Sequence, residues 1–256
     1  MGDSLSPSIV GYQNKGFENS GYSISAITFL SMGESADEMT LGDIRVSEGF
    51  VSSKITFLTR TGASARTDFK GGKVAASYVY WFSADEPNDG EGWYLEADDE
   101  TTVNQNGVVI PFGSGFMVFK DAGDEDPELI YAGQVSTTPT TKGFESTGYN
   151  ICGNCSPVDI TLGDITVNSG FVSSKICFLT RTGASARVDF KGSKVAAAYT
   201  YWTEEDEPND GPGWYLEADD ETTENQNNLV IAAGQGFLVF NDAGDENPTI
   251  TIPSAL

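Results

Sequence analysis

The chain has 256 residues, of which 39% are hydrophobic and 11% aromatic, and its formal net charge is −24. This richness in aromatic residues excludes a disordered chain, and the negative charge disfavours nucleic acid and anionic membranes as partners. The sequence has no histidine, which excludes Ser/His/Asp and Cys/His catalysis, and it has no apolar run long enough to insert into a membrane.

The predicted elements are β-strands almost throughout. Each is short, and each is either alternating in polarity or rich in β-branched and aromatic residues. Gly, Asn, Asp and Pro in the intervening turns separate them. In chain order, the strands predicted for the first half are Ser8–Tyr12, Tyr22–Leu30, Met39–Val46, Lys54–Arg60, Ala65–Phe69, Val74–Phe82, Gly107–Ile110, Gly115–Phe119 and Glu128–Ala132.

The second half of the chain repeats the first. From Leu41 onward the two copies are offset by 121 residues (position 41 to 162), and roughly three quarters of the positions in Leu41–Asp126 are identical. Before Leu41 the offset is 127 (position 16 to 143), so the first copy holds six extra residues. A repeat of this length is a whole domain. We therefore predict an all-β protein of two tandem antiparallel β-sandwich domains, jelly-roll-like, at residues 1–133 and 134–256.

A string rich in carboxylates and aromatic rings occurs in both copies. It reads EPNDGEGWYLEADDETT at residues 86–102 and EPNDGPGWYLEADDETT at residues 207–223, so only Glu91 and Pro212 differ. Paired carboxylates beside aromatic rings are typical of glycoside hydrolysis. Acidic residues are abundant throughout this chain, however, and near-identical duplication suits a structural repeat better. We predict that the protein is not an enzyme and has no catalytic residues.

Basic and acidic residues are segregated within each copy. Ten of the 14 basic residues form two matching blocks, each followed by an acidic block. We hypothesise that the basic face of one domain meets the acidic face of the next, head to tail, with the first such contact inside the chain; contacts of this kind propagate into filaments or lattices. Alternatively, the charges pair within each domain and contribute little. The basic face comprises Lys54, Arg60, Arg66, Lys70, Lys73, Lys175, Arg181, Arg187, Lys191 and Lys194; the acidic and aromatic face comprises Trp93, Glu96, Asp98, Asp99, Trp214, Glu217, Asp219 and Asp220.

Oxygen-bearing residues in several turns are candidate calcium ligands, although none matches an EF-hand and solvated turns are the alternative. The tripeptide Glu-Pro-Asn at residues 86–88 and 207–209 resembles the calcium and sugar motif of C-type lectins, but no other motif of that family is present. A calcium-dependent carbohydrate-binding or adhesion module, with glycans as partners, is therefore the second functional hypothesis. The calcium candidates are Asp85, Glu86, Asn88, Asp89, Asp121, Asp124, Asp206, Glu207, Asn209, Asp210, Asp242 and Asp245.

The three cysteines, Cys152, Cys155 and Cys177, all lie in the second copy. Their β-rich surroundings do not fit a redox motif, which opens a helix, and a zinc site needs a fourth ligand. We predict one disulfide that joins Cys177 to either Cys152 or Cys155. Since Thr56 occupies the place of Cys177 in the first copy, the bond is not essential to the domain.

The tryptophans divide into two groups. Tyr78 and Tyr80 share one face of their strand and Trp81 takes the other, as alternation requires. We predict that Trp81 and Phe116 lie in the core. Trp93 and its copy Trp214, flanked by Gly and acidic residues, are the predicted surface tryptophans, suited to an interface.

Each copy carries a Gly-Tyr pair, Leu-Gly-Asp-Ile, a tryptophan strand and Gly-x-Gly-Phe, at Gly113–Phe116 and Gly234–Phe237. This order resembles tandem β-rich modules of secreted bacterial surface proteins of unknown function. The resemblance implies export and a structural or adhesive role. We thus expect an extracellular or cell-surface protein that associates with itself. Since Met1–Ser4 does not resemble a signal peptide, we expect a mature, exported chain.

Overall fold

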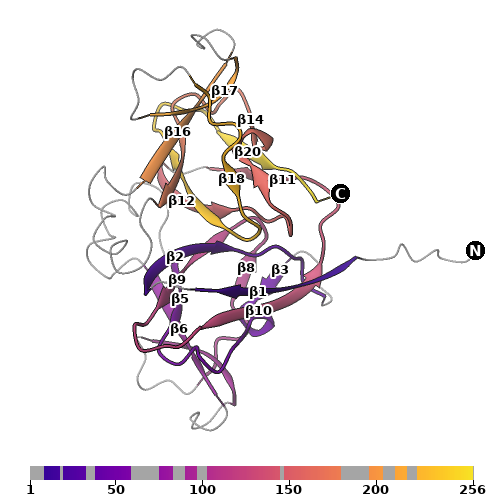
Figure 1. The fold of residues 1–256 in the computed structure, drawn as a ribbon, viewed down its shortest axis with the longest axis vertical. Helices are drawn as coiled ribbons and strands as arrows, with labels where there is room; N and C mark the ends of the chain where they lie inside the picture. Colours follow the sequence, from indigo (N-terminus) through magenta and orange to yellow (C-terminus); the bar gives the residue numbers. More distant parts are fainter. Residues whose placement is uncertain are drawn as a thin grey trace, which may run out of the picture.

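A computed structural model describes residues 9–17, 20–32, 38–58, 75–82, 90–96, 103–144, 147–179, 196–203, 211–217 and 224–255. In this part of the chain the protein is built from β-strands and two short 3-10 helices, and the strands pair in several small antiparallel sheets (Figure 1). No helix within the described ranges is long and apolar enough to cross a bilayer. The predicted all-β class is confirmed, whereas the jelly-roll order and the domain boundary at residue 133 stay predictions.

The strands follow one another in the same way in both repeats. The first repeat contains β1 (Val10–Gly16), β2 (Gly21–Ala26), β3 (Glu38–Thr40), η1 (Leu41–Asp43), β4 (Arg45–Val46), β5 (Lys54–Leu58), β6 (Ala75–Trp81), β7 (Gly92–Leu95), β8 (Val109–Pro111), β9 (Gly115–Lys120) and β10 (Glu128–Gln134). The second contains β11 (Thr140–Gly143), β12 (Gly148–Gly153), β13 (Ile160–Thr161), η2 (Leu162–Asp164), β14 (Thr166–Val167), β15 (Lys175–Leu179), β16 (Ala196–Trp202), β17 (Gly213–Leu216), β18 (Val230–Ile231), β19 (Gly236–Asn241) and β20 (Thr249–Ile252).

The two repeats also share their sheet order. A five-stranded sheet runs β2-β9-β5-β6-β7 in the first repeat and β12-β19-β15-β16-β17 in the second. A three-stranded sheet runs β1-β10-β4 and β11-β20-β14, and a small pair joins β3 to β8 and β13 to β18. Each repeat has its own core, and in the first repeat it joins residues of the three-stranded sheet, such as Leu129, to residues of the five-stranded sheet, such as Phe116. The prediction that Phe116 is buried is confirmed.

Several strands differ from the sequence-based prediction. The first strand, β1, covers Val10–Gly16 and not Ser8–Tyr12, and it pairs along its whole length with β10 of its own repeat. The segment predicted as one strand over Met39–Val46 is interrupted by η1, because Asp43 Oδ2 accepts hydrogen bonds from the backbone N–H and the hydroxyl of Thr40. Strands β7 and β11 were not predicted, and the predicted strand Ala65–Phe69 lies outside the described residues.

The two repeats bury equivalent faces against each other. A third core cluster contains Ile24 and Met117 from the first repeat and their counterparts Ile151 and Leu238 from the second. Two isolated bridges are reciprocal: β2 of the first repeat meets the second repeat at Ser25 and Gln235, and the equivalent residues Cys152 and Ser114 also pair. A contact in which the same surfaces exchange partners is isologous. The expectation of a head-to-tail contact inside the chain is therefore wrong.

Close approach at this interface explains the glycine motif. A Cβ atom on Gly115 would lie 2.6 Å from Ile151 Cγ2, and one on the equivalent Gly236 would lie 2.2 Å from Ile24 Cγ2. The equivalent residues Ala26 and Gly153 face each other directly, since a Cβ on Gly153 would lie 2.4 Å from that of Ala26. The second glycine of Gly-x-Gly-Phe is thus required by the packing of one repeat on the other.

Candidate interaction surfaces

The described charges of the two predicted faces pair within each repeat. Lys54 Nζ lies 2.6 Å from Glu96 Oε1, and Lys175 forms the same ion pair with Glu217. Lys54 also lies over the ring of Phe119, 5.1 Å from its centroid. These contacts match the alternative in which acids and bases meet inside one domain. The remaining charges of the two faces, Arg60, Arg66, Lys70, Lys73, Asp98, Asp99, Arg181, Arg187, Lys191, Lys194, Asp219 and Asp220, lie outside the described residues.

The tryptophans predicted at the surface are buried. Trp93 and Trp214 are both 0% exposed, so this prediction is wrong. The indole N–H of Trp93 donates to the Ile44 carbonyl at 3.0 Å, and its ring packs edge-on against Phe50 and Tyr80. The flanking Gly and acidic residues suggested exposure, but β7 pairs with β6 and turns the indole toward the aromatic core.

The exposed tryptophan of the first repeat is Trp81, which is 38% exposed. Its predicted place in the core is wrong, because Tyr78 and Tyr80 occupy the inward face of β6 and alternation turns Trp81 outward. Trp81 stacks on Tyr94 with ring centroids 5.5 Å apart, and the equivalent rings of Trp202 and Tyr215 lie 5.0 Å apart. Strand alternation placed Trp81 on the face opposite Tyr78 and Tyr80, but only the packing of the sheet shows which of these faces is inward.

The described aspartates proposed as calcium ligands accept hydrogen bonds from nearby backbone N–H groups. The carboxylate of Asp124 accepts from the N–H groups of Val51, Ser52 and Ser53 at 2.7–3.1 Å and from the Ser53 hydroxyl at 2.6 Å. Asp245 repeats the three backbone contacts in the second copy. This donor-rich environment explains the conserved acid in both copies as a structural cap.

The other two described candidates have hydrogen-bond partners within their own turns. Asp121 accepts from the N–H of Gly123, and Asp242 accepts from that of Gly244, as in an Asx turn. Within the described ranges, no group of three or more acidic or cysteine side chains is arranged to hold a metal. The remaining calcium candidates, Asp85, Glu86, Asn88, Asp89, Asp206, Glu207, Asn209 and Asp210, lie outside the described residues and stay predictions.

The predicted disulfide is absent. All three cysteines are described, and all three are buried free thiols. Cys152 and Cys155 belong to the core of the second repeat, whereas Cys177 points to the opposite side of the sheet, into the cluster between the repeats. Strand β19 also separates β12 from β15, so the pairing fails on geometry. Burial raises the pKa of Cys152 and of Cys177 to about 12, which keeps both thiols protonated and unreactive.

Comparison with known proteins finds no matching family model, no similar curated protein and no similar solved structure. The function is therefore argued from the molecular surfaces themselves.

Proposed function

We propose that this is an extracellular structural or surface-assembly protein that associates with itself and is not an enzyme. The observation that carries the proposal is the reciprocal packing of the repeats. Because both repeats bury the same face, the other surfaces that the two copies share occur twice in one chain, and β6 and β16 lie toward opposite ends of the molecule (Figure 1). A molecule that offers one surface twice can bind two neighbours, which is sufficient for an extended assembly.

The proposed joint uses the charged blocks. Lys54 and Glu96 mark where the basic and acidic blocks of the first repeat meet, and Lys175 and Glu217 do so in the second. Exposed ion pairs of this kind contribute on the order of 0–1 kcal/mol. They can therefore be exchanged for the same pairs between neighbouring molecules at little energetic cost. Salt should weaken such a joint because exposed charges are screened.

Sedimentation velocity and negative-stain microscopy at low and high salt test the proposal. We expect oligomers or filaments at low salt that dissociate at high salt. The double variant Lys54→Gln, Lys175→Gln should remain monomeric, since both joints lose a charge. The matched control is Thr141→Glu, Thr166→Glu, which reaches the same net charge on an exposed sheet face of the second repeat and should still assemble. A parent protein that stays monomeric at high concentration in both buffers would contradict the proposal.

Carbohydrate binding is the second functional hypothesis, and it loses its predicted aromatic platform because Trp93 and Trp214 are buried. Its calcium candidates in the described turns are occupied by backbone donors. Assembly is therefore the better supported function. A different surface of the first repeat offers a place for a sugar.

A further inference from the structure

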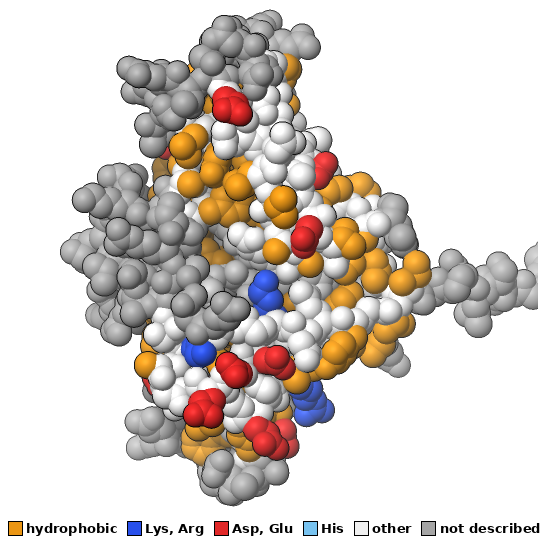
Figure 2. Space-filling view, viewed as in Figure 1, with side chains coloured by type: hydrophobic (Ala, Val, Ile, Leu, Met, Phe, Trp, Pro, Cys, Tyr) orange, Lys and Arg blue, Asp and Glu red, His pale blue; other side chains and the backbone are white. Residues whose placement is uncertain are grey.

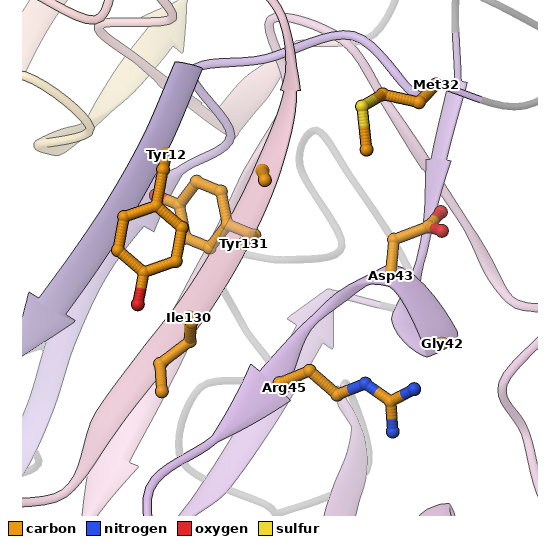
Figure 3. A pocket seen from close by; sticks show the side chains of 8 residues that line it. Tyr12, Met32, Gly42, Asp43, Arg45, Ile130 and Tyr131 are labelled. Carbon is orange, nitrogen blue, oxygen red and sulfur yellow. The ribbon is translucent and has the colours of Figure 1, made fainter. Parts of the chain in front are cut away.

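An open cavity lies on the three-stranded sheet of the first repeat, beside η1. Its volume is about 350 Å³, in the range of small-molecule sites. Figure 3 shows Tyr12 and Ile130 on one side of it and Met32, Asp43 and Arg45 on the other. The complete lining is Tyr12, Met32, Gly42, Asp43, Arg45, Ile130, Tyr131 and Ala132.

The rim of the cavity is apolar and accessible. Tyr12 is 65% exposed and Met32 is 59% exposed. Tyr12 lies directly opposite Ala132 in the β1–β10 pairing, and Ile130 lies opposite Arg45 in the β10–β4 pairing, so the three strands present these side chains side by side. Hydrophobic side chains gather on this side of the molecule, near the start of β1 (Figure 2). The phenol ring of Tyr12 and the aliphatic side chain of Ile130 can pack against the C–H face of a ligand.

The opposite side of the cavity carries hydrogen-bonding groups. Both hydrogen bonds that Asp43 accepts from Thr40 use Oδ2, and the residue is exposed, which leaves Oδ1 available to a ligand hydroxyl. Arg45 supplies guanidinium donors. The hydroxyl of Tyr80 donates to Glu91 Oε1 at 2.7 Å and also interacts with Arg45, so Tyr80 is a protein partner of the guanidinium.

The second repeat has the same backbone elements around the equivalent position but different side chains. Gly42 and Asp43 recur as Gly163 and Asp164, because η2 needs the same cap. The residues that distinguish the first repeat are replaced: Tyr12 by Pro139, Arg45 by Thr166, Ile130 by Thr251 and Glu91 by Pro212, while Met32 lies in the stretch where the first copy has its six extra residues. These replacements remove the phenol ring, the guanidinium and the carboxylate of Glu91 from the equivalent surface of the second repeat.

We propose that this cavity is a carbohydrate-binding site, specific to the first repeat, that takes one neutral sugar unit. The sugar ring packs against Tyr12 and Ile130, and its hydroxyls bond to Asp43 and Arg45. Because two carboxylates, Asp43 and Glu91, accompany the single guanidinium of Arg45, and the whole chain carries −24, the site does not favour an anion. A hydrogen-bond donor (Arg45) and an acceptor (Asp43) lie beside an apolar surface, and a neutral sugar ring has hydroxyl groups and an apolar C–H face that complement them.

Saturation-transfer NMR titrations of the full chain with the methyl glycosides of mannose, galactose, glucose and N-acetylglucosamine test the site. At least one should bind saturably, with a dissociation constant on the order of 1 mM for a ligand of this size. Tyr12→Ala should weaken binding about tenfold, and Arg45→Thr should do the same, since loss of one good contact changes affinity by about that factor. Both variants should fold, because Tyr12 is largely exposed and the second repeat already has Thr166 at the second position.

The matched control is Thr166→Ala, at the position of Arg45 in the second repeat, which should leave sugar binding unchanged. Three results would overturn the proposal: no sugar binds saturably, binding survives in both first-repeat variants, or inorganic phosphate binds at the cavity in place of the sugars. Sedimentation of Tyr12→Ala separates this site from self-association. That variant should still assemble, so failure of one proposal leaves the other standing.

Discussion

Replacing Asp124 by Asn tests whether this carboxylate is a structural cap or a calcium ligand. Asp124 is 8% exposed, and its carboxylate accepts hydrogen bonds from three backbone N–H groups and one hydroxyl. Asn keeps one oxygen acceptor but places an NH₂ group among donors. Hydrogen bonds to a charged group contribute about 1.5–3 kcal/mol each, and part of this network survives, so we expect a loss of about 2–4 kcal/mol in the free energy of unfolding.

The copy in the second repeat provides an internal scale. Asp245 accepts hydrogen bonds from the three equivalent backbone N–H groups, lacks the hydroxyl partner and is more exposed. Asp245→Asn should therefore lower the free energy of unfolding by less than Asp124→Asn does. For a chain of this size, the larger loss corresponds to a fall in Tm of roughly 5–15 °C.

Differential scanning calorimetry of the parent and both variants, in calcium and in EDTA, measures these losses. A cap predicts the same loss in both buffers. If EDTA alone lowered the Tm of the parent to that of Asp124→Asn, the carboxylate would be a calcium ligand and the reasoning would be refuted.

Two further predictions concern the cysteines. Cys177 lies opposite Ala198, whereas in the first repeat Thr56 lies opposite Ser77 with their hydroxyl oxygens 3.1 Å apart. Cys177→Thr should therefore cost about 1–3 kcal/mol in urea unfolding, and adding Ala198→Ser should recover much of that loss; additive effects would contradict the pairing. Burial raises the pKa of Cys152 and of Cys177 from the unfolded value of 9.0 to about 12. Below pH 9 both thiols are protonated in the folded and in the unfolded protein, so their full contribution to stability is present. Above pH 9 the unfolded chain loses these protons first, and the free energy of unfolding falls by about 1.4 kcal/mol per thiol for each pH unit. Urea unfolding between pH 8 and 10.5 should show a steeper loss in the parent than in a variant with both changed to Ala, and equal slopes would argue against it.

The repeated acidic and aromatic string at residues 86–102 and 207–223 contains a contact that the sequence alone did not predict. The one difference between its copies, Glu91 against Pro212, occurs in a turn and looks neutral in the sequence. In the structure, Glu91 accepts the hydroxyl of Tyr80, which also interacts with Arg45, a residue that the second repeat lacks. Arg45 belongs to the three-stranded sheet and Tyr80 to the five-stranded sheet, so only the tertiary packing of these sheets could relate them.

The sequence by itself determined the all-β class, the duplication and most strand positions, because turn residues and alternating polarity act locally. It also predicted correctly that Phe116 is a core residue. Alternation places neighbouring residues on opposite faces of a sheet but does not say which face is inward. The tertiary structure alone decided that Trp93 is buried and Trp81 exposed, that Cys152 and Cys177 point to opposite sides of one sheet, and that the repeats meet reciprocally, since each of these depends on which distant strand packs against the face.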